Sequence, residues 1–294
     1  MPFWIDLVST AIWPLLSGAV RPFWIAAAYP RAVSLTDRSR WISLVTPGAS
    51  LPPDGARVAS CGNLRDSFAR NEMVRIGAGR LVLSDGTCLA LSPRARRWSP
   101  EPRFRPVDPD VLFSTARQVV DSLLRTPPHG DPMVPIVLAR ALPSFDCLIQ
   151  ALATGRPETV VAETLRLTGL GPGVTPLGDD LLVGCCLGLT VLGRTSRQRN
   201  RWLALRALVA ETAAPRTTAR SAAWLRHAGR GEFARELVAF GRALTTPNRR
   251  WVERSLQRVL AIGSSSGWSA AYGASRSSAL LLELTDGHPA RSPG

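Results

Sequence analysis

Two adjacent aspartates follow a glycine-rich stretch near the middle of the chain, and they are the residues best placed to do chemistry. The stretch runs from Thr168 to Asp180 and reads TGLGPGVTPLGDD. Its glycines and prolines predict a turn-rich loop, and Thr175 followed by Pro176 predicts the N-cap and first position of a helix. Asp179 and Asp180 then lie in the first turn of that helix.

These carboxylates have a structural and a functional interpretation. At a helix N-terminus each is stabilised by the helix dipole by roughly 0.3 to 1 kcal/mol. Alternatively, the loop offers backbone N–H groups to an anion, with Gly171, Gly173 and Gly178 as binding residues beside the hydroxyl of Thr175. A phosphate next to two aspartates needs arginine or a cation such as Mg²⁺ as a bridge. We favour the second interpretation, in which both aspartates are catalytic candidates, one of them faces the ligand, and Asp180 is the candidate metal ligand.

Two other segments combine small and polar residues at predicted helix starts. Thr217, Arg220 and Ser221 have the spacing of one helix face, and ordinary capping explains most of that pattern. The functional alternative is a hydroxyl and guanidinium edge to an anion site. Farther on, residues 262–268 read IGSSSGW and form a second candidate anion-binding turn,. Its candidate binding residues are Ser265, Ser266 and Gly267.

The basic composition excludes some chemistry. The formal net charge is +14, and every one of the 36 basic residues is arginine. Without lysine there is no Schiff base, no lysine nucleophile and no Walker-type lysine. The arginines are scattered and no nucleic-acid-binding motif is present, so we disfavour nucleic acid as a partner. Arginine-favouring codon usage explains the charge equally well.

The cysteines and histidines show no metal-ligand spacing. The five cysteines are Cys61, Cys88, Cys147, Cys185 and Cys186, and we interpret them as small buried residues in a reducing compartment, which predicts a cytoplasmic protein,. The three histidines, at positions 129, 227 and 288, are too far apart to suggest a zinc site.

The helix that follows Asp180 is apolar on every face, so we expect it to be surrounded by other helices. Gly184 and Gly188 lie four residues apart within it and would let a neighbouring backbone come close. This segment is therefore predicted to be the central buried helix of its domain.

The N-terminal part of the chain has a different character. Residues 1–25 are apolar but interrupted by Pro14, which fits neither a secretory signal nor a membrane span, and we expect an extension there,. Residues 26–105 contain short β-like runs at 31–35, 41–45 and 73–76. The clearest element is a hairpin over 80–91, with Asp85-Gly86 predicted to form a type I′ turn,.

Beyond a proline-rich linker at 99–110 the pattern becomes helical, and residues 106–286 form the second domain, followed by a tail at 287–294,. Asp110 is the expected cap of the first helix. Helices are predicted at 111–124, 134–142, 145–153, 157–169, from Thr175 onward, and at 197–211, 218–228, 233–244, 249–262 and 268–284. The predicted fold class is α+β: a small antiparallel sheet or barrel, then a helical domain around a central buried helix.

The three polar segments together resemble the AllH-type family, which is associated with a subunit of oxamate carbamoyltransferase. The resemblance rests on GLGPGVTPLGDD at 169–180, on TTARS at 217–221 and on IGSSSGW at 262–268. It implies transfer of a carbamoyl group between oxalurate and phosphate, which gives oxamate and carbamoyl phosphate in purine (allantoin) degradation. It also implies an anionic small-molecule substrate and other transferase subunits as partners. The alternative is a non-catalytic assembly subunit. No transmembrane segment is expected.

Overall fold

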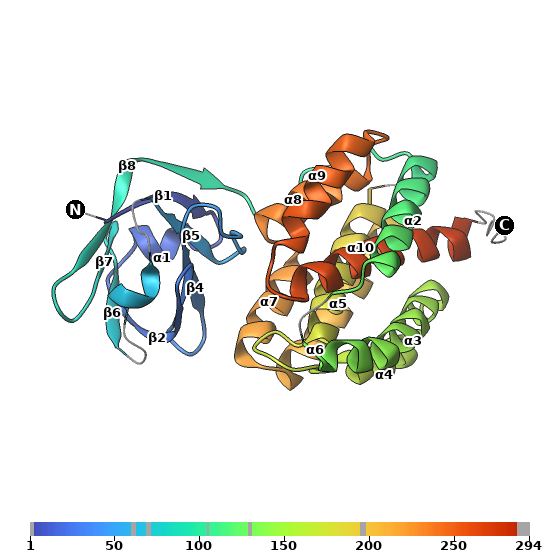
Figure 1. Cartoon of the computed structure of the whole chain (residues 1–294), viewed down its shortest axis with the longest axis horizontal. Helices are drawn as coiled ribbons and strands as arrows, with labels where there is room; N and C mark the ends of the chain where they lie inside the picture. The colour runs from blue at the N-terminus through green and yellow to red at the C-terminus, as the bar shows by residue number, and fades with distance from the viewer. Residues whose placement is uncertain are drawn as a thin grey trace. The chain divides into compact units, whose positions relative to one another are not determined.

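The computed structural model describes residues 3–59, 63–68, 72–104, 106–128, 131–194 and 198–286. The chain divides into two compact units, Met1–Pro100 and Glu101–Gly294. The first is made of strands and the second of helices (Figure 1), so the fold class is α+β, as predicted. Cys61, His129, His288, the predicted helix start at Arg197 and the predicted tail at 287–294 lie outside the described residues.

The first unit is a closed eight-stranded barrel. Its order is β1-β5-β4-β3-β2-β6-β7-β8, and a parallel pairing of β8 with β1 closes it. The β4–β5 pair is also parallel, and the remaining pairs are antiparallel. The strands are β1 Phe3–Ser9, β2 Arg21–Tyr29, β3 Ala32–Thr36, β4 Trp41–Val45, β5 Gly55–Val58, β6 Met73–Gly77, β7 Arg80–Val82 and β8 Cys88–Trp98, with short helices α1 Trp13–Ser17 and η1 Leu64–Ser67.

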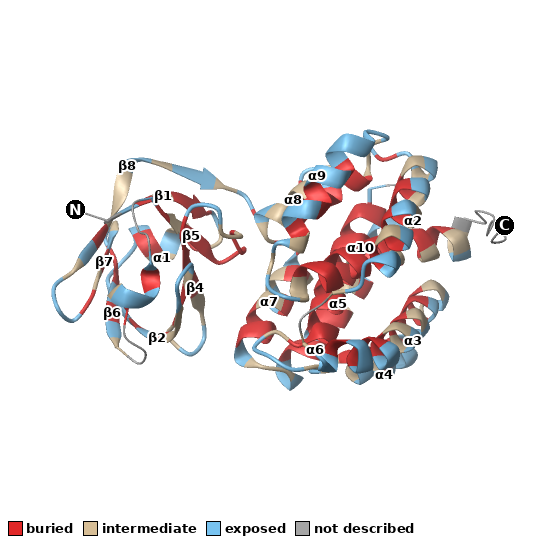
Figure 2. Ribbon diagram, viewed as in Figure 1, coloured by how far each residue is buried: buried red, intermediate tan, exposed pale blue. Residues whose placement is uncertain are grey.

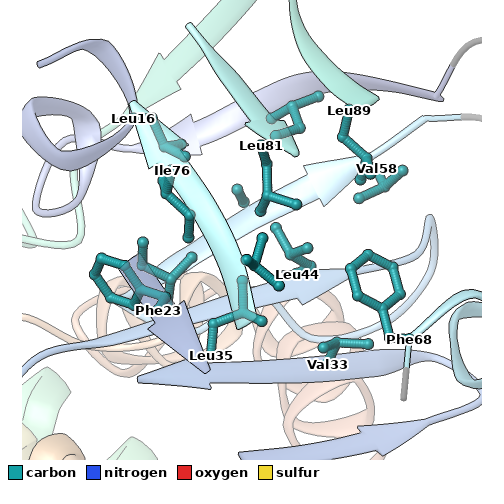
Figure 3. Close-up of a cluster of buried hydrophobic side chains, with 14 of the residues drawn as sticks. Leu16, Phe23, Val33, Leu35, Leu44, Val58, Phe68, Ile76, Leu81 and Leu89 are labelled. Atoms are coloured by element: carbon teal, nitrogen blue, oxygen red, sulfur yellow. The ribbon is translucent and has the colours of Figure 1, made fainter. Parts of the chain in front are cut away.

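Apolar side chains fill the barrel. Because successive residues of a strand point to opposite faces, every second residue faces inward, as in Phe23 and Ile25 of β2 and Val33 and Leu35 of β3. Figure 3 shows Phe23, Val33 and Leu35 among apolar side chains from β4, β6, β7 and β8. The alternation detected in the sequence is therefore the inward face of a barrel.

Residues 3–25 supply β1, α1 and the start of β2 rather than a separate extension. Ile5 and Val8 of β1 are fully buried in the barrel core. Trp4, the residue before Ile5 in the same strand, is exposed. Strand β1 pairs with both β5 and β8, so the barrel is closed by the segment that we expected to lie outside the domain.

The predicted type I′ turn is wrong. Leu83 N–H donates to the Thr87 carbonyl at 2.9 Å and Gly86 N–H donates to the Leu83 carbonyl at 3.2 Å, which makes the loop one residue longer than a two-residue turn. Gly86 has φ +86°, whereas Asp85 is not among the residues with positive φ. A type I′ turn needs positive φ at both central residues, so the longer loop, in which only Gly86 of this pair has positive φ, is not a type I′ turn.

The second unit is helical, and α5 within it is buried along its whole length (Figures 1 and 2). All the residues from Leu177 to Leu192 are buried, in agreement with their apolar composition. The helices are α2 Pro109–Arg125, α3 Met133–Thr154, α4 Pro157–Leu167, α5 Leu177–Leu192, α6 Arg199–Ala213, α7 Ala219–Arg230, α8 Arg235–Leu244, α9 Arg249–Leu260 and α10 Ser266–Asp286, with a 3₁₀ turn η2 at Ala214–Arg216.

Small residues let α5 and α10 pack backbone to backbone. A Cβ atom added at Gly184 would lie 2.2 Å from the Ala270 carbonyl oxygen, and one at Gly188 would lie 2.1 Å from Ser277 Oγ. A Cβ atom added at Gly273 of α10 would likewise lie 2.3 Å from the Leu181 carbonyl oxygen. The expected close approach at Gly184 and Gly188 is thus confirmed.

Three helix boundaries differ from the sequence prediction. Helix α3 is continuous through Pro143, although the missing N–H of this proline leaves one helical hydrogen bond unmade,. The cap of α2 is Asp108, whose side chain accepts from Asp110 N–H at 2.9 Å. Helix α5 begins at Leu177 with Pro176 at the N-cap position, so Thr175 is not its cap.

Two further features concern α3 and the cysteines. By length and composition α3 passes as a membrane span, the one described helix to do so, yet its Asp146 pairs with Arg276 of α10 at 2.8 Å.

Cys185 and Cys186 are buried as expected, and burial raises the pKa of Cys186 to about 12. Cys88 and Cys147 are exposed, so the interpretation as buried residues is wrong for these two.

Candidate functional site

The Asp179 carboxylate joins three segments of the helical unit. Its side chain is fully buried in the first turn of α5. Oδ1 accepts a hydrogen bond from Gly169 N–H at 2.8 Å, and Oδ2 accepts one from the Thr217 hydroxyl. Both carboxylate oxygens are therefore engaged by the protein itself, which gives Asp179 a positioning role between the loop and the start of α7.

The loop ahead of α5 depends on glycine. Gly169, Gly171 and Gly173 have φ values of +72°, +114° and +99°, a region that glycine enters without steric cost,. Gly178 has a different reason: a Cβ atom there would lie 2.0 Å from the Leu167 carbonyl oxygen. The four predicted loop glycines thus shape the backbone, and Gly173 has no neighbour within 4 Å of its Cβ position.

The start of α7 is tied to the same loop by a residue that the sequence analysis did not single out. Thr218 is the N-cap of α7, and its Oγ1 accepts from Ser221 N–H at 3.2 Å. The same hydroxyl donates to the Val174 carbonyl at 2.6 Å. A threonine beside Thr217 at a predicted helix start was the available signal, but only the fold reveals its partner in the loop.

Arg220 and Ser221 both lie buried in the first turn of α7. The Arg220 guanidinium carbon is 4.9 Å from the centroid of the Trp224 ring, one turn farther along the helix. A buried guanidinium in a first turn opposes the helix dipole. The free-energy cost of placing the Arg220 guanidinium there is reduced where negative charge lies near it.

The start of α10 meets the loop through hydroxyl groups. Ser266 Oγ lies 3.1 Å from Thr175 Oγ1. Gly267 is required at this point because a Cβ atom would lie 1.9 Å from the Val259 carbonyl oxygen, and the preceding turn contains Gly263 with φ +61°. Ser265 contributes its carbonyl to the first turn of α10 by accepting from Ser269 N–H at 2.9 Å.

The N-termini of α5, α7 and α10 therefore converge on one loop. Helices α5 and α10 run in the same direction, since Gly184 lies against Ala270 and Gly188 against Ser277. Their positive ends lie at the same end of the pair, where Thr175 contacts Ser266. Each N-terminus carries a partial charge of about +0.5, so their convergence favours bound negative charge.

Asp180 lies beside this point with unsatisfied hydrogen-bonding capacity. Its residue is 3 % exposed, and among the described residues Oδ2 has no hydrogen-bond partner. Burial raises the pKa of Asp180 well above its usual range, the hydroxyls of Ser266 and Thr175 lower it in part, and Asp179 raises it further. The carboxyl is consequently held toward its neutral form, in which it donates as well as accepts.

The arrangement does not fit a divalent cation. No group of three or more histidine, cysteine, aspartate or glutamate side chains that could hold a metal ion occurs in the described part of the chain. Both oxygens of Asp179 already accept hydrogen bonds, and the raised pKa of Asp180 disfavours the ionised carboxylate that Mg²⁺ prefers,. We therefore derive no step through Mg²⁺.

The sequence that forms this site matches a known protein family. The family described as oxamate carbamoyltransferase subunit AllH has a model that matches residues 167–277. The matched range begins at the end of α4, ends in α10 and contains all three polar segments. The match supports the resemblance found in the sequence over this range. No solved structure matches the chain.

Proposed function

We propose that this chain is a subunit of a carbamoyl-transferring enzyme and that its anionic substrate binds where α5, α7 and α10 begin. The description of the matched family supplies the enzyme class. The reaction that we assign is transfer of a carbamoyl group from oxalurate to phosphate, with oxamate and carbamoyl phosphate as products. Both reactants are anions, as is each product. A cytoplasmic location and a role in allantoin degradation belong to the same proposal.

The convergence of three helix N-termini is the observation that carries it. Helix N-termini attract anions through their dipoles. Some first-turn N–H groups here already have partners: Gly178 N–H donates to the Leu170 carbonyl and Gly267 N–H to the Ile262 carbonyl, both at 2.9 Å. The Thr217–Asp179 and Thr218–Val174 hydrogen bonds hold two of these turns against the loop, and the Thr175–Ser266 contact holds the third. Preorganised donors of this kind stabilise developing negative charge most effectively.

The chemistry needs few protein groups. A phosphate oxygen attacks the carbamoyl carbon of oxalurate, and negative charge develops on the carbonyl oxygen of the tetrahedral centre. The centre collapses when its bond to the oxamate nitrogen breaks, and that nitrogen takes up a proton as oxamate leaves. Backbone N–H groups at the helix starts would bind the phosphate and the developing oxyanion, with Arg220 on the phosphate side.

Asp180 suits the proton step. A carboxyl group that its surroundings keep neutral near pH 7 can donate a hydrogen bond or a proton. Burial and the neighbouring Asp179 push its pKa in that direction. We therefore assign Asp180 as the catalytic acid toward the leaving nitrogen, and Asp179 as the residue that positions the loop and α7.

A second candidate function is a non-catalytic assembly subunit. The hydrogen bonds of Asp179 favour it, because a carboxylate whose two oxygens bind Gly169 and Thr217 already has a structural role. In that case the polar segments only hold helix starts together. The two candidates differ in what Asp180 contributes to turnover.

The test is an assay of the assembled enzyme. The chain is purified with its candidate partner subunits, and carbamoyl phosphate formation from oxalurate and phosphate is followed. Asp180→Ala is expected to lower kcat by about 10²- to 10⁴-fold, whereas Asp121→Ala, at an exposed aspartate of α2 outside the three polar segments, serves as the matched control and leaves it unchanged. Normal turnover by an intact complex with Asp180→Ala supports the assembly role instead.

A further inference from the structure

The outer surface of α9 is an amphipathic face with a distinct composition. Arg250, Arg254 and Arg258 are spaced four residues apart, so their side chains share one side of the helix,. Trp251 and Gln257 fall on the same side, and all five residues are exposed, Trp251 to 37 %. We call these five residues the α9 arginine face. The opposite side of α9 is buried through Val252, Ser255, Leu256 and Val259 (Figure 2).

The arginine face has no acidic residue to balance it. None of its three arginines forms an ion pair with any described carboxylate. Glu253, three residues from Arg250 and four from Gln257, borders the face, but it pairs with Arg249 at 3.0 Å. The Arg254 guanidinium instead donates to the Arg250 carbonyl at 3.2 Å.

The array also works against the stability of α9 itself. Like charges four residues apart on a helix repel each other. The first turn of α9 contains Arg250 and no acidic residue, which is the reverse of what the helix dipole favours,. A covering surface that carries negative charge would remove both penalties.

The same residues have the composition of an interaction hot spot. Tryptophan and arginine are the side chains most enriched where binding energy concentrates in protein–protein interfaces. A tryptophan among arginines matches a partner surface that offers an apolar recess bordered by carboxylates. Nucleic acid and anionic lipid also attract arginine, and the cross-linking experiment below distinguishes them from protein.

We propose that the α9 arginine face is a docking surface for an acidic patch of a partner protein, with Trp251 at one edge of the face in the first turn of α9. Charge complementarity sets the partner's chemistry, and the apolar ring of Trp251 is desolvated on binding. The inference does not depend on the proposed transferase activity. A transferase subunit is one protein that would satisfy it.

The experiment places a photo-cross-linking amino acid at the position of Gln257 in the full-length chain, expressed in cells. A matched chain carries the same amino acid at Gln150, an exposed glutamine on α3. The chain cross-linked from position 257 is expected to yield one protein adduct whose linked peptide is rich in aspartate and glutamate. Position 150 is expected to yield none of it.

Two variants connect the adduct to the face. R250E/R254E/R258E and, separately, Trp251→Ala are expected to lower the adduct yield about tenfold or more. R125E/R140E/R156E changes the net charge by the same amount at exposed arginines elsewhere in the helical unit and is expected to leave the yield unchanged. Thermal unfolding midpoints are measured for all variants to check that each one is folded. Reversal of the partner's acidic residues to arginine should restore binding to the triple glutamate variant.

Three results overturn the docking proposal. They are the absence of an adduct from position 257 above the level from position 150, an adduct with nucleic acid or lipid in place of protein, and equal yields from R250E/R254E/R258E and R125E/R140E/R156E. The identity of the captured protein bears separately on function. A partner that is not a transferase subunit weakens the proposed activity and leaves the docking surface in place.

Discussion

The Thr217 hydroxyl donates a hydrogen bond to the Asp179 carboxylate, and this contact fastens the start of α7 to the first turn of α5. The other oxygen of Asp179 accepts from Gly169 N–H. One buried side chain thus fixes the loop and two helix starts. Its replacement should therefore lower the free energy of unfolding more directly than it affects catalysis.

Replacement of Asp179 should therefore destabilise the helical unit. Asp179→Ala leaves both Gly169 N–H and the Thr217 hydroxyl without their acceptor and is expected to lower the free energy of unfolding by about 3 to 5 kcal/mol,. Thr217→Val removes one of the two bonds and should cost about 1 to 2 kcal/mol. Urea unfolding at neutral pH measures both. Equal stability of Asp179→Ala and wild type would contradict the positioning role.

Asp180 should make stability depend on pH in a direction opposite to most carboxylates. Its pKa is raised in the folded state by burial, so the folded state binds its proton more tightly than the unfolded state does. Its contribution to stability is complete below about pH 4 and is lost as the pH rises toward the folded-state pKa, by about 1.4 kcal/mol per pH unit.

Asp180→Asn keeps the shape and removes the titration, so the comparison isolates this one group. Stability of the two proteins is measured by urea unfolding from pH 4 to pH 8. The free energy of unfolding of wild type should fall relative to that of Asp180→Asn as the pH rises. A difference that stays constant, or that changes in wild type's favour with rising pH, would show that Asp180 is ionised in the folded protein.

The hydroxyls of Thr175 and Ser266 should be energetically coupled. They lie 3.1 Å apart and both lower the pKa of Asp180. Thr175→Val and Ser266→Ala should each cost about 0.5 to 1.5 kcal/mol, with the double variant close to either single one. Each substitution should also raise the pKa of Asp180 further, which moves the pH-dependent loss of stability upward. Simple additivity would argue against a contact between the two helix starts.

The close α5–α10 contact predicts different stability costs for alanine at two glycines. One is Gly184, inside α5, and the other is Gly193, at its C-cap. Gly184→Ala places a Cβ atom 2.2 Å from the Ala270 carbonyl and should cost about 2 to 4 kcal/mol, because backbone must move,. Gly193→Ala is the control: its nearest contact is an ordinary 3.5 Å and its φ of −59° suits alanine. Chemical unfolding that finds similar costs at both positions would be inconsistent with the close helix crossing.

Local patterns predicted the elements whose causes are local. The runs at 31–35, 41–45 and 73–76 became β3, β4 and β6, because alternating apolar residues need one buried face,. The apolar composition after Asp180 predicted a buried helix, and the spacing of Gly184 and Gly188 predicted a close neighbour. The identity of that neighbour, α10, depends on the tertiary fold.

The features that the sequence did not predict depend on contacts between distant segments of the chain. Strand β1 closes the barrel by a parallel pairing with β8, a contact across most of the unit that no local pattern encodes. Asp179 and Asp180 are sequence neighbours of one type, yet Asp179 is satisfied by Gly169 and Thr217 while Asp180 retains an unpartnered oxygen. Burial and distant donors separate their chemistry, and the sequence shows neither.

An anomalous difference map from crystals of the chain soaked in arsenate, a phosphate analogue with an anomalous signal, tests the central claim most directly. The account predicts one arsenic peak at the junction of α5, α7 and α10, with arsenate oxygens within hydrogen-bonding distance of first-turn N–H groups and of the Asp180 carboxyl. A junction without arsenate, while sites elsewhere on the chain are occupied, would contradict it.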